Sequence, residues 1–443
     1  MESIRIFTCI NLRGVETELQ IRINLRKDNI SKLEKMIIIL LALCPILQHY
    51  KGLYVNAAVT VLLVSFPFAA FKLYKKRLIS LKRMRYVAPL VVFSLFKVID
   101  HGTTVDETGQ AIIFSIIVIA ISCSCFDVKY FERVVVGVSI AASLLIIVQY
   151  FHYYLFDYHL KLVPTSLLLD RSDQWVLAAE TGRASISGRI SKFYRPSAFF
   201  LEPSHMFIYM FMPLVLLLLS PRFNRQKSLA AVLLTVGMIF STSGMGIMMA
   251  IGIWILFIGR DYNNKRGFSL RKILRPTSFL ILFVFIAAII FVYFRVPFFR
   301  NSMERIWGSG GDYKNAIAGR VESAFGLVSQ LRGLQIIRGV GDRLTNITFN
   351  MSGFYSTMYR YGIIGTVLSY AFYLQSLARL KNRHFWICAI IIVLSFFSAH
   401  SHSTMFMIYS TFVLIQGYIE NEIVDEVGDC TVSSCGYLTI RVV

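Results

Sequence analysis

Hydrophobic residues along this chain fall in long runs that are separated by polar or charged connections. Twelve runs approach or reach the roughly 17 to 25 residues that a helix needs to cross the hydrocarbon core of a bilayer. The pattern therefore predicts an all-α integral membrane protein with about twelve transmembrane helices, within a range of about ten to thirteen. The runs are 36–50, 53–73, 86–99, 109–126, 134–156, 198–220, 228–241, 244–259, 278–295, 353–376, 385–398 and 402–418.

The runs and the two longest polar connections divide the chain into consecutive parts. Because 35 polar, charge-rich residues precede the first run, no cleavable signal peptide is expected. The expected parts are a cytoplasmic N-terminal segment (1–35), helices one to five (36–156), an external loop (157–197), helices six to nine (198–295), a large external loop with an amphipathic helix (296–352), helices ten to twelve (353–418) and a cytoplasmic tail (419–443).

Composition narrows the class of protein. Apolar residues make up 56% of the 443 residues and charged residues only 16%, against about a quarter charged in an average soluble domain. This composition excludes a disordered chain and argues against an ordinary soluble enzyme. The seven cysteines predict no zinc or disulfide framework, because Cys123 and Cys125 form only a C-x-C inside an apolar run.

The net charge of +21 comes mostly from one set of connections. Both termini and every second connection together hold 29 Lys and Arg residues, whereas the intervening short connections hold only Lys51. Cytoplasmic connections of membrane proteins carry such an excess. Both termini are therefore expected in the cytoplasm, and binding to nucleic acid is not needed to explain the charge.

The two long external loops, 157–197 and 296–352, do not follow this charge rule. They hold 13 Lys and Arg residues, and ten of the 13 are Arg. Long loops cross a membrane regardless of charge, so the topology still holds. Because Arg binds phosphate or carboxylate groups in a bidentate manner, these loops are expected to recognise an anion.

The end of the first loop offers the clearest candidate residues. Pro203 is expected in the first turn of a helix, where its missing N–H costs nothing. Glu202 would then lie at the outer membrane boundary, and it is the only carboxylate within the twelve runs. An ionisable residue at that depth is a functional candidate. Alternatively, Glu202 caps the helix and pairs with Arg195.

The second loop is expected to contain a helix on the membrane surface. Val321, Phe325, Val328 and Leu331 recur at helical spacing, with Arg320 in the first turn. This amphipathic helix is expected to end within 337–343.

Two arginines, Arg338 and Arg343, flank the glycines of the segment 337–343. Glycines in such a place let backbone N–H groups approach an anion closely. The alternative is a plain turn with solvated charges.

Further polar residues fall inside or between the later runs. Arg360 lies in the tenth run, where an arginine is costly unless it faces a cavity or an anion. His400 and His402 lie in a short outer turn, where structural histidines are equally expected. Lys97 and Arg295 are, with Arg360, too scattered for a proton relay.

Several other chemistries are not supported by any motif. The chain has no P-loop, no G-x-S-x-G and no H-E-x-x-H. No Asp-x-Asp lies in a segment expected outside the membrane, so the chemistry is expected to need no metal and no cofactor.

Four runs occur in a definite order across about 195–365. Together they resemble the family of bacterial O-antigen polymerases (Wzy-type) and O-antigen ligases. The four are R-P-S-x-F-x-x-E-P-S at Arg195–Ser204, S-T-S-G-M-G at Ser241–Gly246, Gly319-Arg320 followed by a surface helix and Gly339-Val340-Gly341, and Tyr359-x-Tyr361-Gly362-Ile363-Ile364-Gly365.

The resemblance implies a multi-pass protein of the bacterial inner membrane with its active site facing outward. It implies glycosyl transfer between oligosaccharides on polyprenyl diphosphate lipids, building O-antigen or capsule, with a chain-length regulator and a flippase as partner proteins and no nucleic acid. By this resemblance the catalytic residues would be Glu202, Arg195 and Arg320, and the diphosphate or substrate would bind Arg343, Arg338, Arg360 and His205.

Two other functions remain open at this point. Ligases of the family carry H-[NSQ]-x9-G-x-x-[GTY]; aligned on Gly362 and Gly365, this chain has Ser352 but places Met351 where the His belongs, which favours a polymerase. A transporter or flippase of lipid-linked sugars would show internal repeats and polar residues near the bilayer midplane. No repeat is visible, and the polar residues gather toward the outer side.

Overall fold

The computed structural model describes residues 30–52, 55–76, 81–101, 105–169, 173–182, 194–261, 324–341, 351–398 and 403–428, with two pairs of short strands and isolated positions between 269 and 300. Most of the predicted ninth run, 278–295, lies outside the described residues. The same is true of the predicted residues Arg320, Arg343, His400 and His402.

The described chain is all-α, as the sequence predicts. Four two-residue strands form two antiparallel pairs, β1 (Ile4–Arg5) with β4 (Thr439–Ile440) and β2 (Ser185–Ile186) with β3 (Arg189–Ile190). The helices are α1 (Lys32–Leu47), α2 (Ala57–Lys76), α3 (Leu81–His101), α4 (Val105–Ser122), α5 (Val128–Phe156), the 3-10 turn η1 (Thr165–Leu167), α6 (Asp173–Thr181), α7 (Pro203–Leu218), α8 (Arg225–Phe240), α9 (Gly244–Ile258), α14 (Leu334–Arg338), α15 (Gly353–Arg379), α16 (Asn382–Ser395) and α17 (Thr404–Gly428).

Eleven of the twelve predicted runs coincide with helices, namely α1 to α5, α7 to α9 and α15 to α17. By length and composition alone, two described helices are long and apolar enough to cross a membrane, α2 over Ala57–Lys75 and α5. Shorter apolar helices cover Thr108–Ser122, Pro203–Leu218, Gly244–Ile258 and Asn382–Ser395.

Helix ends differ from the apolar runs where polar side chains find partners. The first helix starts at Lys32 rather than 36, because the Ser31 side chain accepts a hydrogen bond from the Glu34 N–H (3.1 Å) and caps it. The last helix runs past 418 to Gly428. Its last turns are polar, and Glu420 and Glu422 are held there by ion pairs with arginines of other helices.

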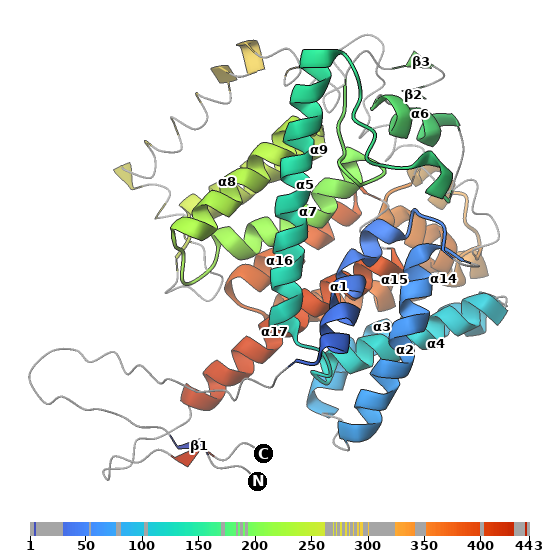
Figure 1. Cartoon of the computed structure of the whole chain (residues 1–443). Coiled ribbons are helices and arrows are strands. Elements are labelled where there is room, and N and C mark those ends of the chain that lie inside the picture. Colours follow the sequence, from blue (N-terminus) through green and yellow to red (C-terminus); the bar gives the residue numbers. More distant parts are fainter. Residues whose placement is uncertain are drawn as a thin grey trace, which may run out of the picture.

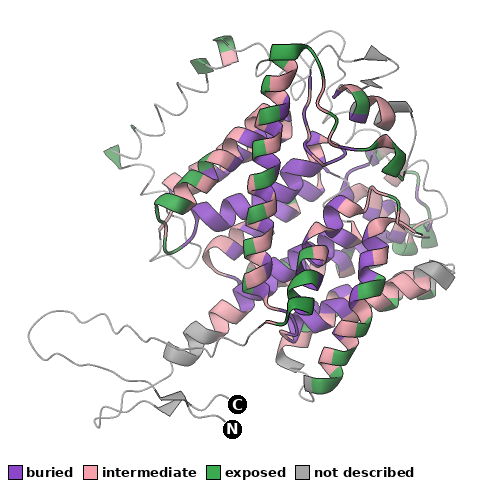
Figure 2. Cartoon of the chain, in the orientation of Figure 1, coloured by how far each residue is buried: buried purple, intermediate pink, exposed green. Residues whose placement is uncertain are grey.

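Helix α7 lies at the centre of the bundle, and its residues from His205 to Leu218 are all buried (Figures 1 and 2). Two tyrosine hydroxyls bind it to its neighbours. Tyr209 donates to the Ala42 carbonyl of α1 (3.1 Å), and Tyr409 of α17 donates to the Tyr209 carbonyl (2.8 Å). Tyr209 and Tyr409 both lie close to the starts of their helices, so the first two turns of α7 and α17 meet at one end of the bundle.

Connections that are predicted to be external meet at that end, which we name the loop end. Here the Tyr50 hydroxyl donates to the Phe199 carbonyl (2.7 Å), which joins the connection after α1 to the segment before α7. The Gly353 N–H donates to the Ser398 carbonyl (2.9 Å), which joins the start of α15 to the end of α16. Each of these two hydrogen bonds joins segments that are far apart in the sequence.

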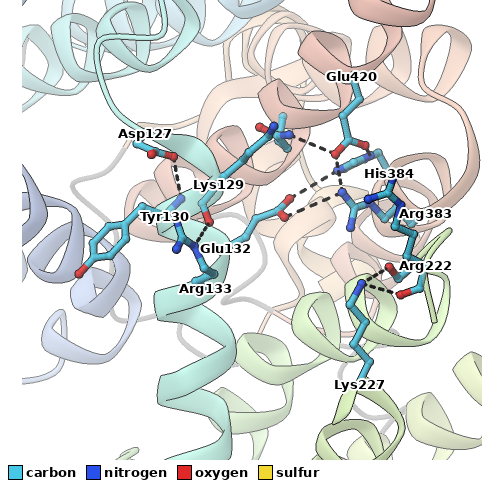
Figure 3. A network of polar contacts seen from close by, with 12 residues as sticks. Asp127, Lys129, Tyr130, Glu132, Arg133, Arg222, Lys227, Arg383, His384 and Glu420 are labelled. Atoms are coloured by element: carbon cyan, nitrogen blue, oxygen red, sulfur yellow. Dashed lines mark hydrogen bonds and ion pairs between the residues drawn. The ribbon is translucent and has the colours of Figure 1, made fainter. Parts of the chain in front are cut away.

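The opposite end, which we name the basic end, holds the Lys- and Arg-rich connections. Arg383 of α16 pairs with Glu420 of α17 (2.5 Å), and Glu132 of α5 lies 3.9 Å from the same guanidinium (Figure 3). His384 lies between both carboxylates, 3.7 Å from Glu132 and 3.6 Å from Glu420. Gly417 makes room for this ring, since a Cβ there would lie 2.6 Å from its Cγ.

This cluster sets the ionisation of Glu420. Burial of the carboxyl works to raise its pKa, but the attraction of His384 and Arg383, with hydrogen bonds from Gln416 and Arg383, holds the pKa of Glu420 below its ordinary value. A carboxyl with a lowered pKa in the folded state stabilises the fold above its unfolded pKa, and that stabilisation is lost as the pH falls through the folded pKa.

We therefore predict that Glu420→Gln lowers the thermal unfolding midpoint at pH 7 but not at pH 3. The carboxylate is partly exposed, so the loss should be about 0.2–1 kcal/mol. The measurement is thermal unfolding of the purified protein between pH 7 and pH 3. Glu180→Gln, an exposed carboxylate of α6, is the control and should show no pH-dependent difference. An equal loss at both pH values would show that Glu420 contributes by packing and not by charge.

Candidate functional site

The segment 194–202 is held in place by one buried polar side chain of α5. Gln149 is 1% exposed, and its amide bridges two parts of the first external loop. Its Nε2 donates to the Leu160 carbonyl (2.9 Å), and its Oε1 accepts from the Ala198 N–H (2.9 Å). Gln149 was not predicted as a functional residue, although a single amide within the apolar run 134–156 is a visible signal.

Tyr194 fixes the residue before Arg195. Its ring stacks on Tyr153 (centroids 4.0 Å apart), and its hydroxyl lies 2.7 Å from His159 Nδ1. The Arg195 N–H donates to the Gly182 carbonyl (2.7 Å), at a glycine whose φ of 63° and contact with the Tyr194 ring leave no room for a side chain. The backbone on both sides of Arg195 is thus fixed.

Two titratable side chains next to Arg195 in the fold, His159 and Tyr194, are neutral at neutral pH. Burial lowers the pKa of His159 to about 4, with a smaller opposing hydrogen bond to Ala179 and repulsion by Lys161 and His152. Burial also raises the pKa of Tyr194 above its ordinary value. Arg195 is half-buried beside these neutral groups and, with Lys161, brings positive charge to this part of the loop end.

Glu202 immediately precedes α7, and Pro203 is the first helical residue, as predicted. The Glu202 side chain makes no hydrogen bond to the N–H groups of the helix, so the capping alternative is not what the structure shows. Instead, Glu202 Oε2 accepts a hydrogen bond from the Ser204 hydroxyl (2.5 Å) and the side chain remains half-buried. A partly accessible carboxylate beside the positive end of a helix is suited to accept a proton or orient a hydroxyl.

His205 follows Glu202 by three residues, in the first turn of α7, and is 6% exposed. Its ring stacks on His49 at the end of α1, with centroids 4.4 Å apart and planes at 11°. This contact packs the start of α7 against α1, so the His205 ring lies in the packed interior.

The Ser241–Gly246 run lies directly beside the Arg195 segment. The Thr242 hydroxyl donates to the Tyr194 carbonyl (3.2 Å), and a Cβ at Gly246 would lie 3.1 Å from that of Phe207. Ser243 caps α9 by accepting from the Gly246 N–H (3.3 Å). Two runs that are separate in the sequence are thus joined.

The predicted surface helix from 321 to 337 is broken in the structure. Residues 324–328 are helical, 329–330 form a turn, and α14 begins only at Leu334, after Gly333 with a φ of 55°. The predicted apolar face is correspondingly divided: Leu331 is buried, whereas Phe325 is 61% exposed. A glycine with positive φ interrupts the helical repeat that the spacing of apolar residues predicts.

Helix α15 is also broken, at Gly362, whose φ of 62° and ψ of −162° are not helical. The break leaves carbonyls without their usual helical partners. The Val340 N–H donates to the Tyr359 carbonyl (3.0 Å), and the Gly341 N–H donates to the Arg360 carbonyl (2.9 Å). The loop after α14 therefore replaces the hydrogen bonds that α15 loses.

This pairing corrects the prediction that Gly339-Val340-Gly341 binds an anion through its N–H groups. All three N–H groups donate within the protein, that of Gly339 to the Gln335 carbonyl (2.8 Å). The glycines are needed because two backbones touch: a Cβ on Gly339 would lie 2.2 Å from the Arg360 carbonyl oxygen. The alternative of a turn with charged neighbours is nearer to what the structure shows.

Basic side chains from three helices surround this break. The backbones of Arg338 and Arg360 are brought together by the contact between Gly339 and α15, and Arg338 is exposed. Lys97 of α3 has its Nζ 5.0 Å from the centroid of the Tyr361 ring. Lys97 was not predicted to lie near Arg360, because the contact of α3 with α15 is not visible in the order of residues.

No protein-family model matches the chain, and no curated protein matches its sequence. Among the described residues, no group of three or more His, Cys, Asp or Glu side chains could hold a metal ion.

We predict that Gly362→Ala releases the loop after α14 from α15. A Cβ at this residue would lie 2.4 Å from the Ile337 carbonyl, and its backbone conformation adds strain of about 1–3 kcal/mol. Hydrogen exchange of the Val340 and Gly341 amides should become faster. Gly326→Ala is the control, because nothing lies within 4 Å of its added methyl group. Equal exchange in the two variants would show that the Gly362 contact does not hold the loop.

Proposed function

We propose that this protein polymerises oligosaccharide repeat units carried on a polyprenyl diphosphate lipid, at the outer face of the bacterial cytoplasmic membrane. One observation carries the proposal. The sequence runs that resemble O-antigen polymerases pair in space, the Arg195 run with Ser241–Gly246 and Gly339–Gly341 with the break at Gly362. Each pair brings a cation to an end of the bundle where carbonyls and hydroxyls also gather.

In the proposed membrane arrangement, about twelve helices span the bilayer, with the basic end in the cytoplasm. Helix lengths support this placement. From Ile363 to Arg379, α15 is about 25 Å long, and α7 is about 24 Å long, at 1.5 Å per residue. Both values are close to the roughly 30 Å of the hydrocarbon core. Glu202 and the Gly362 break then lie near the outer boundary, where lipid phosphates are found.

The proposed reaction is a glycosyl transfer. A hydroxyl oxygen of the incoming repeat unit forms a bond to the anomeric carbon of the donor glycan, and the bond between that carbon and the diphosphate oxygen breaks. The electron pair of the broken bond leaves with the lipid diphosphate, and the proton of the attacking hydroxyl passes to a base. Guanidinium groups placed where the leaving negative charge develops lower the barrier.

Residue roles follow from the geometry and from the resemblance. Glu202, half-buried and hydrogen-bonded to Ser204, is proposed as the base that receives the proton. Arg195, fixed by its backbone, is proposed to stabilise the diphosphate. Arg320 and Arg343 are proposed as further diphosphate ligands from the resemblance alone.

We predict that Glu202→Gln abolishes polymer while leaving protein abundance unchanged. General-base catalysis contributes about 10²–10⁴-fold to a reaction rate. The rate of polymer formation should therefore fall by a factor of at least about 10². Polymer length is read from glycan ladders of cells in which the variant replaces the wild type. Glu180→Gln should keep the wild-type ladder. Full-length polymer from Glu202→Gln would show that Glu202 is not the base. Long lipid-linked glycan chains in a strain that lacks the protein would contradict its proposed function as a polymerase.

We predict opposite membrane sides for the two ends of the bundle. Leu169 is 49% exposed at the loop end, and Arg222 is exposed at the basic end. In a variant without native cysteines, Leu169→Cys should react with a membrane-impermeant maleimide in intact spheroplasts. Arg222→Cys should react only after permeabilisation. The reverse pattern would place the proposed site in the cytoplasm and contradict the proposal.

A further inference from the structure

Two arginines from different helices lie beside one buried tyrosine ring at the basic end. The guanidinium carbon of Arg85, in α3, lies 5.1 Å from the centroid of the Tyr86 ring, and that of Arg379, the last residue of α15, lies 5.4 Å from the same centroid. Tyr86 is 5% exposed, and its ring stacks on Tyr418 of α17 with centroids 3.8 Å apart. Cation–π contacts with one fixed ring therefore hold two positive charges close together. We name Arg85 and Arg379 the arginine pair.

The arginine pair differs from its neighbours at the basic end in what it contacts. Arg83, two residues before Arg85, forms an ion pair with Glu422 of α17 (2.9 Å). In the part of the chain that the structure describes, no carboxylate forms an ion pair with Arg85 or Arg379, and both residues are exposed. Two guanidinium groups in this arrangement suit an anion that offers several oxygens. Phosphate is such an anion, because arginine can bind two of its oxygens at once.

Exposed aliphatic side chains follow the arginine pair along both helices. On α3, Val92 and Leu95 are 48% and 43% exposed, and they follow Arg85 by seven and ten residues, which is the spacing of one helix face. On α15, which packs against α3, Val367 and Leu374 are 60% and 54% exposed and lie seven residues apart, again on one face. The surface next to the two charges is therefore suited to hydrocarbon.

The lengths of these surfaces match one leaflet of a bilayer. At 1.5 Å per residue, Leu95 lies about 15 Å along α3 from Arg85, and Val367 lies about 18 Å along α15 from Arg379. Half of the hydrocarbon core is about 15 Å thick. In the membrane arrangement proposed above, the arginine pair then lies at the level of the headgroups on the cytoplasmic side, where anionic lipids give the membrane a negative surface potential.

We propose that Arg85 and Arg379 bind the phosphate of an anionic phospholipid in the cytoplasmic leaflet, whose acyl chains lie against the exposed aliphatic side chains of α3 and α15. The inference goes beyond the proposed function and uses only the membrane arrangement given there. Because the arginine pair forms only when α3 and α15 pack together, the lipid binds the folded protein and stabilises it. The lipid joins the two helices on the side opposite the proposed glycosyl transfer.

The first test measures the affinity of the purified full-length protein for phosphatidylglycerol in detergent micelles, by native mass spectrometry. Loss of two charge-assisted contacts in Arg85→Gln/Arg379→Gln should weaken binding on the order of tenfold or more. Phosphatidylcholine, which carries a phosphate but no net charge, should bind the wild type more weakly than phosphatidylglycerol does. Equal affinity of the wild type for the two lipids would overturn the assignment of an anionic lipid.

The matched control is Arg222→Gln/Arg225→Gln. It removes the same charge from two other exposed arginines of the basic end, just before α8 and at its first residue. This variant should bind phosphatidylglycerol like the wild type. Equal losses in the two double variants would show a general attraction to a basic surface and would overturn the site. Wild-type affinity in Arg85→Gln/Arg379→Gln would overturn it as well.

The second test locates the lipid on the wild-type chain, so it decides the matter if the double variant does not fold. The protein is placed in phosphatidylcholine nanodiscs with a small fraction of phosphatidylglycerol that carries a photoreactive group in one acyl chain. Cross-links should map to peptides covering 88–99 and 363–379, and excess unlabelled phosphatidylglycerol should suppress them. Cross-links that this excess does not suppress, or that lie only on other helices, would overturn the site.

Neither measurement needs turnover, so the two proposals fail separately. Absence of lipid at the arginine pair, together with loss of polymer in Glu202→Gln, would remove only the phospholipid site. Lipid at the arginine pair, together with normal polymer from Glu202→Gln, would remove only the proposed base.

Discussion

Backbone carbonyl groups in apolar surroundings must find hydrogen-bond donors, and this requirement builds the loop end of the protein. Tyr50 serves the Phe199 carbonyl, and Gln149 serves that of Leu160. At the break in α15, the N–H groups of Val340 and Gly341 serve two more carbonyls. Each of these irregular segments is thus held in place by a hydrogen-bond donor from another part of the chain.

The same requirement for hydrogen-bond donors explains where Arg195, Arg338 and Arg360 lie in the fold. When a backbone N–H group donates to a carbonyl of another segment, the residues next to it in the sequence are placed beside that segment as well. Arg338 arrives beside Arg360 because the glycines after it must approach α15 closely enough to donate, and Arg195 is placed by the donors and acceptors on both sides of it. Uncharged backbone groups thus set the positions of these three arginines along the chain.

Eleven of the twelve predicted runs coincide with described helices, and α7 starts at Pro203 as predicted, because hydrophobic runs and a proline at the first helical position are local signals. It did not predict the breaks at Gly333 and Gly362. Glycine is tolerated in a helix, and only the approach of a second backbone decides that a helix opens there. Lys97 and Gln149 were missed for a related reason, since their partners lie on helices distant in the sequence.

The break at Gly362 links stability to the proposed chemistry. Glycine already costs a helix about 1 kcal/mol relative to alanine, and the open conformation forgoes further hydrogen bonds within α15. An uninterrupted α15 would regain those bonds, but it would leave Val340 and Gly341 without acceptors and would move Arg338 away from Arg360. The break therefore lowers the local stability of α15. It also attaches a loop beyond the proposed membrane boundary to α15 at one defined point. An anion-binding group on a free loop would have to be ordered again each time a lipid binds, whereas one attached in this way is already in position.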